Sequence, residues 1–381
     1  MALQITYVQS ERREQLNIDF HYGVVYVLAR LANVPPAQAQ TIAHACQYVD
    51  DATTDGTLNF STGEAFERFA TAHVMVDYHT LNRRDDSTVW VPFHFFPGGQ
   101  GVTLDERAVC RPNSAPVQEM VQAALQAKGR PNGAHRLGIA LHTYVDTWAH
   151  QNFAGIPSAA NAVSHLKDDT APQQGFVEEV KGLFGHLEAT VVDGLFDATR
   201  KWSGGALVGH GAALTFPDLP YARWSYVDGH GIPVSRNNLP DFLAAADHAY
   251  SMLCAWQAGS VSIDPALVLP AATRSALQTL LSTNRSTDAD ARLAAIAAAL
   301  ARGDIPGLKE SLPAYIGKGI GSWKHLATGI EAADDQYGVA SAPPYRALFE
   351  TSDYRHFHAA VKEARLIITE EILPRHNVRL L

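Results

Sequence analysis

One apolar segment with three metal-ligand side chains in register constrains this chain more than any other feature. Residues 136–155 read RLGIALHTYVDTWAHQNFAG, and His142, Asp146 and His150 recur there at every fourth position. Because an α-helix turns by about 100° per residue, these side chains share one face over two turns. Zinc and similar divalent ions accept imidazole and carboxylate ligands, and burying such groups without partners is costly. The segment predicts a metal-binding helix; the alternative is a buried helix whose polar groups bond to neighbouring elements.

The composition is that of a folded globular protein. Of 381 residues, 46% are hydrophobic and 18% are charged. The net charge is −9 and no basic run occurs, which argues against a nucleic-acid polymer as partner. Glu11, Arg12 and Arg13 interrupt the N-terminal segment where a secretory signal would be apolar, and no later run reaches about 18 apolar residues. We therefore expect a cytoplasmic protein with no signal peptide and no transmembrane segment.

Histidine and cysteine usage narrows the kind of metal site. Thirteen of the 17 histidines lie between His21 and His248, so we expect the chemistry in the first two thirds of the chain. The three cysteines form no CxxC pair. Three cysteines also cannot all be paired in disulfides within one chain. This favours a reducing compartment and argues against a Cys-rich zinc site.

The spacing of apolar residues predicts a mainly α protein, in which strand-like alternation is scarce. We expect a metal-binding helical catalytic domain over 1–257 and a C-terminal helical extension over 258–381 packed on it. A Gly- and Pro-rich passage at 206–238 has the character of a binding loop. Helical spacing covers six segments before the C-terminal third: 18–50, 63–81, 114–129, 134–152, 176–202 and 241–259.

Two further groups of His and Asp residues are candidates to complete a metal shell. Asp50 and Asp51 end a predicted helix, where two adjacent carboxylates are unfavourable unless a cation compensates them. The alternative is a solvated pair at a turn. His73 and Asp77 are four residues apart on one predicted helix face, and an ordinary polar face is the alternative there.

The loop regions offer other candidates. A flanking glycine lets the backbone approach a site closely at His210, and Asp218 lies in the same passage, although both residues could simply shape turns. His94 in VPFHF is flanked by aromatic residues, and we expect a core or pocket-wall residue there rather than a ligand. The many aromatic residues near these motifs indicate a ligand with an apolar or ring-bearing part, although most such residues on amphipathic helices belong to the core.

Taken together, these motifs resemble the zinc-dependent phospholipase C and S1/P1 nuclease superfamily, an all-α fold that carries a cluster of up to three zinc ions. More closely, IDFHYGVVYVLAR, QYVDDAT, VPFHF and RLGIALHTYVDTWAHQNFAG look like an uncharacterised bacterial family of domains of unknown function related to that phospholipase group. The resemblance covers roughly residues 17–230. It implies a multi-helix phospholipase C/P1 nuclease-like bundle with a metal cluster and long loops.

The resemblance also implies roles for individual residues. His21 would hold a shared ion, Asp50 or Asp51 would supply a mid-chain carboxylate, and His73 would follow as the next ligand. On the central helix, His142 and Asp146 would form the central pair, Asp146 would bridge, and His150 would hold a second ion. Because the downstream HxxxE pair of the superfamily is absent, His210 or Asp218 would replace it. We expect two or three divalent ions, zinc first, with iron or manganese as alternatives.

We therefore expect a metal-dependent hydrolase of phosphoester bonds that acts through a metal-activated water, with Asp51 as general base and Asp146 as the second catalytic residue. Its partner would be a small-molecule or lipid-like substrate with an apolar portion. Two alternatives use the same ligands: a di-iron or other His/carboxylate oxygenase on a helical scaffold, and a non-catalytic helical metal-binding module. No HD dipeptide, GxSxG elbow, Walker A loop or HExxH motif points to another hydrolase class.

Overall fold

The computed structural model describes residues 18–72, 86–170, 208–333, 335 and 341–380, and this part of the chain is mainly helical, as predicted. Its α-helices are α1 (Val25–Leu31), α2 (Pro36–Asp51), α4 (Val91–Phe93), α5 (Leu104–Ala108), α6 (Ala115–Leu125), α7 (Gly133–Ala149), α10 (Asn238–Ala258), α11 (Ala271–Thr283), α12 (Ala289–Arg302), α13 (Trp323–Thr328), α14 (Asp353–Leu366) and α15 (Leu373–Arg375). Wider and tighter helical turns are η1 (Asp19–Val24), η3 (Asp86–Trp90), η4 (Ala159–Asn161), η5 (Gly211–Ala213), η6 (Phe216–Asp218), η7 (Ala347–Thr351) and η8 (Ile367–Ile372).

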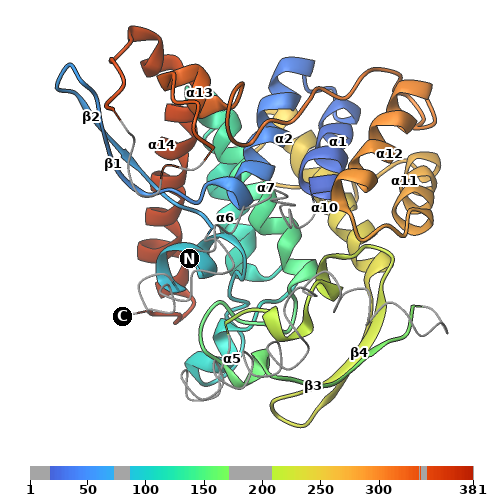
Figure 1. Ribbon diagram of the computed structural model, residues 1–381. Helices are drawn as coiled ribbons and strands as arrows, with labels where there is room; N and C mark the ends of the chain where they lie inside the picture. The colour runs from blue at the N-terminus through green and yellow to red at the C-terminus, as the bar shows by residue number, and fades with distance from the viewer. Residues whose placement is uncertain (1–17, 73–85, 171–207, 334, 336–340, 381) are drawn as a thin grey trace, which may run out of the picture.

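Helix α7 lies at the centre of the fold, and α2, α6, α10 and α14 pack around it (Figure 1). All of its residues but Ala134 are buried, and the polar side chains among them find partners on neighbouring elements, as Arg136 does with Glu363 on α14. Helix α2 approaches α7 closely at Gly138. A Cβ there would lie 2.4 Å from the carbonyl oxygen of Ile42 and 2.7 Å from the Cβ of Ala45. Only glycine allows this spacing, which brings the end of α2 beside His142.

The C-terminal third shares its core with the rest of the chain. One buried hydrophobic cluster includes Leu141 on α7 together with Ile296, Leu300 and Ile368 from beyond the expected boundary at 257/258. That boundary falls at the end of α10. Polar contacts add to the packing: the buried Arg292 guanidinium donates to both carboxylate oxygens of Asp19 at 2.8 and 3.0 Å. The extension is therefore fixed directly to η1, two residues from His21.

Strands form two small antiparallel sheets within the described residues. Strands β1 (Gly56–Asn59) and β2 (Ala65–Arg68) form a hairpin, and the order of the second sheet is β3 (Val163–Asp168), β4 (Arg223–Asp228), β5 (Pro233–Asn237). The helix predicted over 176–202 and residues 73–81 of the helix predicted over 63–81 lie outside the described residues. Within the described part, the helix predicted over 63–81 is wrong at β2. There Arg68 forms a buried ion pair with Asp335 at 2.6 Å, a partner so distant in sequence that local periodicity carries no trace of it.

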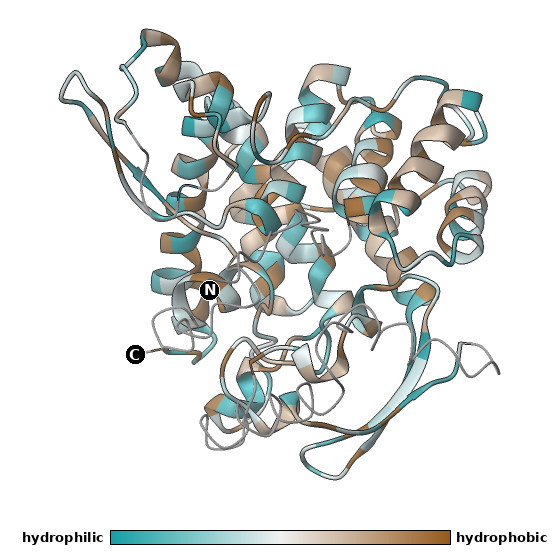
Figure 2. Ribbon diagram, in the orientation of Figure 1, coloured by the Kyte–Doolittle hydropathy of each residue, from teal (hydrophilic) through white to brown (hydrophobic). Residues whose placement is uncertain are grey.

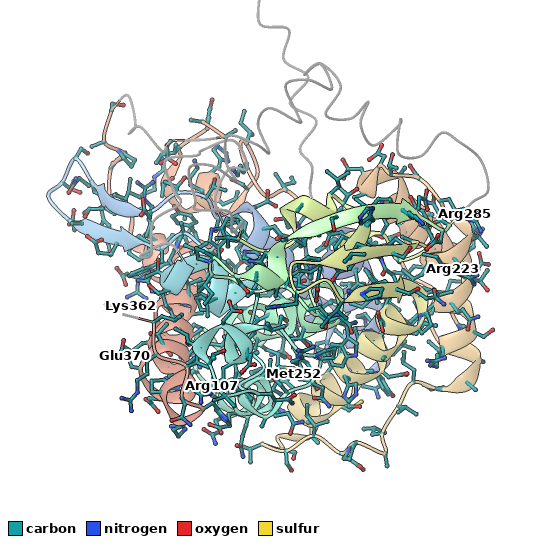
Figure 3. All side chains as sticks on the ribbon, turned by 90° about the horizontal axis from the view of Figure 1, so that it is seen from below. Arg107, Arg223, Met252, Arg285, Lys362 and Glu370 are labelled. Carbon is teal, nitrogen blue, oxygen red and sulfur yellow. The ribbon has the colours of Figure 1, made fainter. Side chains whose placement is uncertain are left out.

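The outer elements separate polar from apolar faces. Helix α14 carries both hydrophobic and hydrophilic residues (Figure 2). Phe357, Ala360 and Val361 are among its buried residues. Charged side chains such as Arg223 and Arg285 lie at the outside of the molecule (Figure 3). In the described ranges, no helix combines the length and apolar character that crossing a bilayer requires.

Candidate metal centre

Four side chains from three parts of the chain bring their ligand atoms together beside α7. Asp50 lies in the last turn of α2, His94 follows α4, and His142 and Asp146 lie one turn apart on α7. His142 Nε2 lies 3.3 Å from His94 Nδ1, 3.3 Å from Asp146 Oδ2 and 3.6 Å from Asp50 Oδ1. His94 Nδ1 lies 3.7 Å from Asp146 Oδ2 and 3.8 Å from Asp50 Oδ1. We call this set the first cluster.

These separations suit a single divalent ion. Four ligands at about 2.0 to 2.2 Å from a tetrahedral ion lie roughly 3.3 to 3.6 Å from one another. The distances among Asp50, His94 and His142 run from 3.3 to 3.8 Å, so these three form a mutually close set of ligand atoms. Asp146 adds a carboxylate oxygen 3.3 Å from His142 and 3.7 Å from His94. The donor set of two imidazoles and two carboxylates is one that zinc, iron and manganese accept.

A second cluster lies at the C-terminal end of α7, where His150 faces His210 and Asp218. His150 Nε2 is 3.3 Å from Asp218 Oδ1, and His210 Nε2 is 3.5 Å from Asp218 Oδ2. All three residues are buried. Three ligand atoms leave one position of a tetrahedral ion open, which is the arrangement of catalytic zinc sites. His150 joins the clusters, because its Nδ1 lies 3.5 Å from Asp146 Oδ2.

The loop that carries His210 and Asp218 is held in place by hydrogen bonds from Asn238 and by close packing of Gly209 on Phe95. Asn238 at the start of α10 donates to the carbonyl oxygens of Phe216 and Leu219, at 2.6 and 2.8 Å, and so holds the turn that contains Asp218. Gly209 has φ +66° and abuts Phe95, where a Cβ would lie 2.3 Å from the ring. The glycine beside His210 is thus required by a close approach, which the GHG motif indicated.

Main-chain carbonyl oxygens orient the histidines of both clusters. His142 Nδ1 lies 2.9 Å from the carbonyl oxygen of Cys46, and His94 Nε2 lies 2.8 Å from that of Thr71. A carbonyl can only accept, so each ring donates there and turns its other, unprotonated nitrogen toward the first cluster. In the second cluster, His150 Nδ1 donates in the same way to the carbonyl oxygen of His94 at 2.8 Å, and His210 Nδ1 to that of Leu214 at 3.1 Å. In its neutral form, each ring therefore directs its unprotonated nitrogen at the cluster, as a metal ligand requires.

The electrostatics of the first cluster also suit a cation. Burial and the neighbouring Asp146 raise the pKa of Asp50 well above its ordinary value. Burial and the adjacent His21 lower the pKa of His142 to about 3, so this ring is neutral and able to ligate. Burial acts against ionisation of Asp146, but His150, His142 and His21 outweigh it and hold the pKa of Asp146 well below its usual range. A bound cation would relieve the repulsion between the two carboxylates.

In the second cluster, the neighbouring carboxylates determine whether His150 is protonated. Burial lowers the pKa of His150, but the Asp146 and Asp218 carboxylates outweigh it and raise that pKa to about 9. Without metal, the positive charge of protonated His150 compensates the negative charge of the Asp146 and Asp218 carboxylates. A bound metal ion would displace this proton at neutral pH, because the cation supplies the same compensating charge. Burial lowers the pKa of His210.

The structure brings together seven of the nine residues that the sequence indicated as ligands. His21 is among them through its Nε2, which lies 3.1 Å from Asp146 Oδ1. The others are Asp50, His142, Asp146, His150, His210 and Asp218. His73 lies outside the described residues.

Asp51 and His94 are placed differently from what the sequence indicated. Asp51 turns toward the C-terminal third, where its Oδ2 accepts a hydrogen bond from Tyr315 Oη at 2.5 Å, and none of the distances within either cluster involves it. His94, which we expected to line a pocket or the core, supplies a ligand atom to the first cluster. The VPFHF motif had already matched the family resemblance, and this was the available signal for His94.

Comparison with known proteins bears on the family but not on the activity. A family model described as a family of unknown function, DUF6765, matches residues 16–372. The chain belongs to this family. The match includes the C-terminal third, beyond the 17–230 covered by the sequence resemblance, so in DUF6765 the extension is part of the family's own architecture. No curated protein and no solved structure matches the chain.

Proposed function

We propose that this protein is a metal-dependent hydrolase of phosphoester bonds. The observation that carries the proposal is the pair of adjacent His/carboxylate clusters: Asp50, His94 and His142 bring their ligand atoms together beside Asp146, and His150, His210 and Asp218 do so at the end of α7. Two neighbouring divalent ions supply Lewis-acid stabilisation of a phosphoryl group and lower the pKa of a bound water. The resemblance of the HxxxDxxxH helix and its upstream motifs to the zinc-dependent phospholipase C group supports the same reading, including its helical-bundle class.

The ligand set favours hydrolysis over the oxygenase alternative. Carboxylate-rich di-iron helical proteins draw on Glu residues and a Glu-x-x-His pattern from facing helices. Among the described residues, the two clusters contain four His and three Asp ligands and no Glu. A purely structural site is less suited to the second cluster, since structural zinc sites are closed by four ligands and rich in Cys.

The surroundings of the clusters suggest what their residues do. His150, His210 and Asp218 would fix one ion and leave a position for water. The Asp50 side chain is 18% exposed, against 3% for Asp146, so it is the carboxylate of the first cluster that faces solvent. We assign to Asp50, in place of Asp51, the orientation of the attacking water.

A small cavity beside His21 and Asp146 suggests the kind of substrate. Its wall is formed by Phe20, Val145, Trp148 and Phe242, all apolar. The apolar or ring-bearing part of the substrate that the sequence indicated would thus lie near apolar side chains, but the cavity itself has room for about one water molecule and does not hold such a group.

The test is phosphodiesterase activity together with metal content. Purified protein should carry zinc or manganese and hydrolyse bis(4-nitrophenyl) phosphate; a chelator should abolish turnover and the metal should restore it. His210→Asn should remove activity while leaving the first cluster's ion bound, and His376→Ala, which lies at the C-terminal end of the chain, should change neither. The proposal is wrong if the protein contains iron and consumes oxygen. It is also wrong if the protein holds metal and shows no turnover with any phosphoester.

A further inference from the structure

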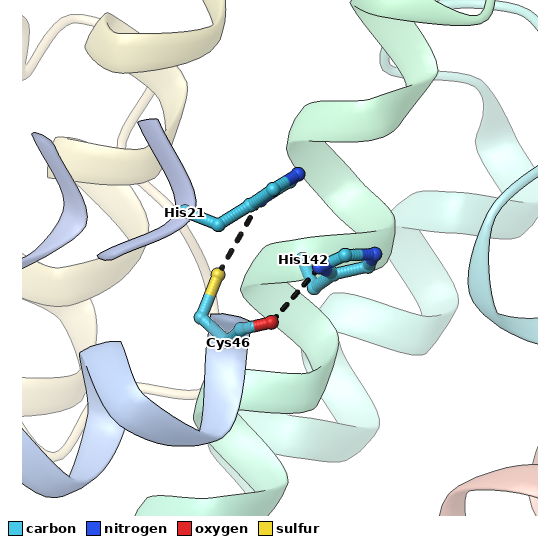
Figure 4. A group of neighbouring side chains, drawn as sticks. All are labelled: His21, Cys46 and His142. Atoms are coloured by element: carbon cyan, nitrogen blue, oxygen red, sulfur yellow. Dashed lines mark hydrogen bonds between the residues drawn. The ribbon is translucent and has the colours of Figure 1, made fainter. Parts of the chain in front are cut away.

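Cys46 lies beside the first cluster, and the geometry around it differs from that of the other two cysteines. Its Sγ lies 3.7 Å from His21 Nδ1, and both residues are buried (Figure 4). The His21 and His142 rings stack with centroids 4.1 Å apart and an angle of 25° between their planes. One ligand atom from each of His21, Cys46 and His142 lies within 4.8 Å of the other two.

The sulfur–nitrogen separation fits two ligands of one ion. Zinc binds a thiolate at about 2.3 Å and an imidazole at about 2.0 to 2.1 Å, which at a tetrahedral angle places the two atoms roughly 3.6 Å apart. The hydrogen bond between a neutral thiol and an imidazole is weak and does not by itself explain why two imidazoles stack beside one buried sulfur.

We propose that His21, Cys46 and His142 form an alternative site, which shares His142 with the first cluster, for a thiophilic divalent cation such as Cd²⁺, Co²⁺ or Zn²⁺. Binding would form metal–sulfur and metal–nitrogen bonds and release the thiol proton to solvent, with no change of oxidation state. Soft thiolate ligands select such ions, whereas the carboxylates of the first cluster also accept harder ones such as Mn²⁺.

The two sets compete for one ring. His142 directs Nε2 toward His94 and Asp50, and its Nδ1 donates to the carbonyl oxygen of Cys46 at 2.9 Å. The same ring therefore serves the sulfur-containing set only by leaving the carboxylate set one ligand short. A thiophilic ion bound at Cys46 would thus weaken metal binding in the first cluster. Which of the two sets His142 joins would then decide which kind of metal ion the protein holds.

The experiment is a titration of the purified full chain with Cd²⁺ and with Co²⁺, followed by thiolate-to-metal charge-transfer absorption in the ultraviolet. All proteins carry Cys254→Ser, because Cys254 is the most exposed of the three thiols. We expect the absorption to appear and saturate, to be lost in Cys46→Ser, and to persist in Cys110→Ser. Cys110 is an apt control, since it is equally buried but its sulfur faces the carbonyl oxygen of Thr147 at 3.9 Å.

The parent protein alone can decide the matter if Cys46→Ser fails to fold. Uptake of Co²⁺ without a charge-transfer band in the parent overturns the site, as does a band that survives in folded Cys46→Ser. His21→Asn, which keeps the thiol, should weaken the band, and an unchanged band would remove His21 from the set. The absorption does not depend on turnover, so this outcome is separate from that of the hydrolase assay.

Discussion

At the scale of single residues, the role of His94 depends on which nitrogen its neighbours leave available. Phe93 and Phe95 on either side are buried, and such a flanking pair is typical of core positions. The ring's Nε2 is used by the carbonyl oxygen of Thr71, and Nδ1 alone is left to face Asp50 and Asp146. No pattern in the VPFHF motif reveals that partner, since Thr71 lies 23 positions earlier in the chain.

We expect His94→Ala to remove the ion of the first cluster. Three ligand atoms would remain there, two of them carboxylates, and truncation would also leave the carbonyl oxygen of Thr71 without its donor. Metal content per chain, measured by elemental analysis, should fall by one ion relative to the parent protein, and phosphodiesterase activity should fall with it. His356→Ala should keep the full metal content, because its ring contacts His135, away from both clusters. Equal metal content in both variants would exclude His94 as a ligand.

A second residue-scale prediction concerns acid stability. Burial, and then Arg68, lower the pKa of His358 to about 3, while the ring accepts a hydrogen bond from the Phe69 amide at 3.1 Å. The unfolded chain, with a pKa near 6.5, binds a proton that the folded state does not, so stability is lost as pH falls from about 6.5 toward 3. One such histidine costs about 2 kcal/mol between pH 7 and pH 5.

His358→Gln removes this titration while keeping an acceptor for the Phe69 amide. Denaturant unfolding at pH 7 and pH 5 should show a smaller loss of stability for the variant than for the parent, by about 2 kcal/mol. His376→Gln, on a half-buried ion pair with Glu119, provides the comparison. If the parent and His358→Gln lose the same stability over this range, His358 is not held neutral by the fold.

At the scale of elements, the pair α2 and α7 determines the geometry of the centre. Helix α7 was predictable from its sequence, because a continuous apolar period and three ligands in register specify both the helix and its functional face. Its distance from α2 was not predictable, since the reason for Gly138 is a backbone carbonyl of another helix, at Ile42. The strand β2 was missed for the same kind of reason: its Arg68 is paired with Asp335.

Gly138→Ala should separate the two helices and disturb the first cluster. A Cβ at 2.4 Å from a backbone oxygen cannot be accommodated without a shift, and overpacking of this kind costs about 1 to 3 kcal/mol. We expect a lower free energy of unfolding and a weaker metal affinity, measured by denaturation and by competition with a chromophoric chelator. Gly211→Ala is the matched control, because a Cβ there meets no atom within 4 Å. A Gly138→Ala variant with parental stability would show that the helices can move apart freely.

At the scale of the whole molecule, the C-terminal third is tied to the N-terminal ligand segment. The bidentate Arg292–Asp19 pair is buried, and Tyr26 and Arg30 on α1 donate to Glu310 at 2.9 and 2.8 Å. The sequence indicated helices after residue 258 but not this attachment, since an ion pair spanning 273 positions leaves no local signal.

Breaking the Arg292–Asp19 pair should destabilise the protein as a unit. Arg292→Leu leaves the Asp19 carboxylate buried without its cation, at a cost of about 3 to 5 kcal/mol, and Arg292→Leu with Asp19→Asn should recover part of that loss. Arg302→Leu, at an exposed pair with Asp304, is the control and should cost little. Thermal unfolding should remain a single transition in each case. A separate early transition for the C-terminal helices would contradict a shared core.

Removal of metal should also act on the whole molecule. The ligands come from segments between residues 50 and 218, and an ion that binds only the folded state stabilises it by mass action. Chelation should therefore lower the melting temperature at neutral pH, by less below about pH 6, where protons compete for imidazole. Identical melting of metal-loaded and chelated protein at pH 7 would mean that the ions are peripheral to folding.

The main-chain acceptors behind the histidines have a consequence for sequence divergence. The oxygens that orient His94, His142 and His210 belong to the peptide groups of Thr71, Cys46 and Leu214. A substitution changes a side chain but leaves its carbonyl in place. A side-chain substitution at position 71 or 214 would therefore leave the oxygen that orients the ring in place, whereas a substitution of the imidazole itself removes the ligand.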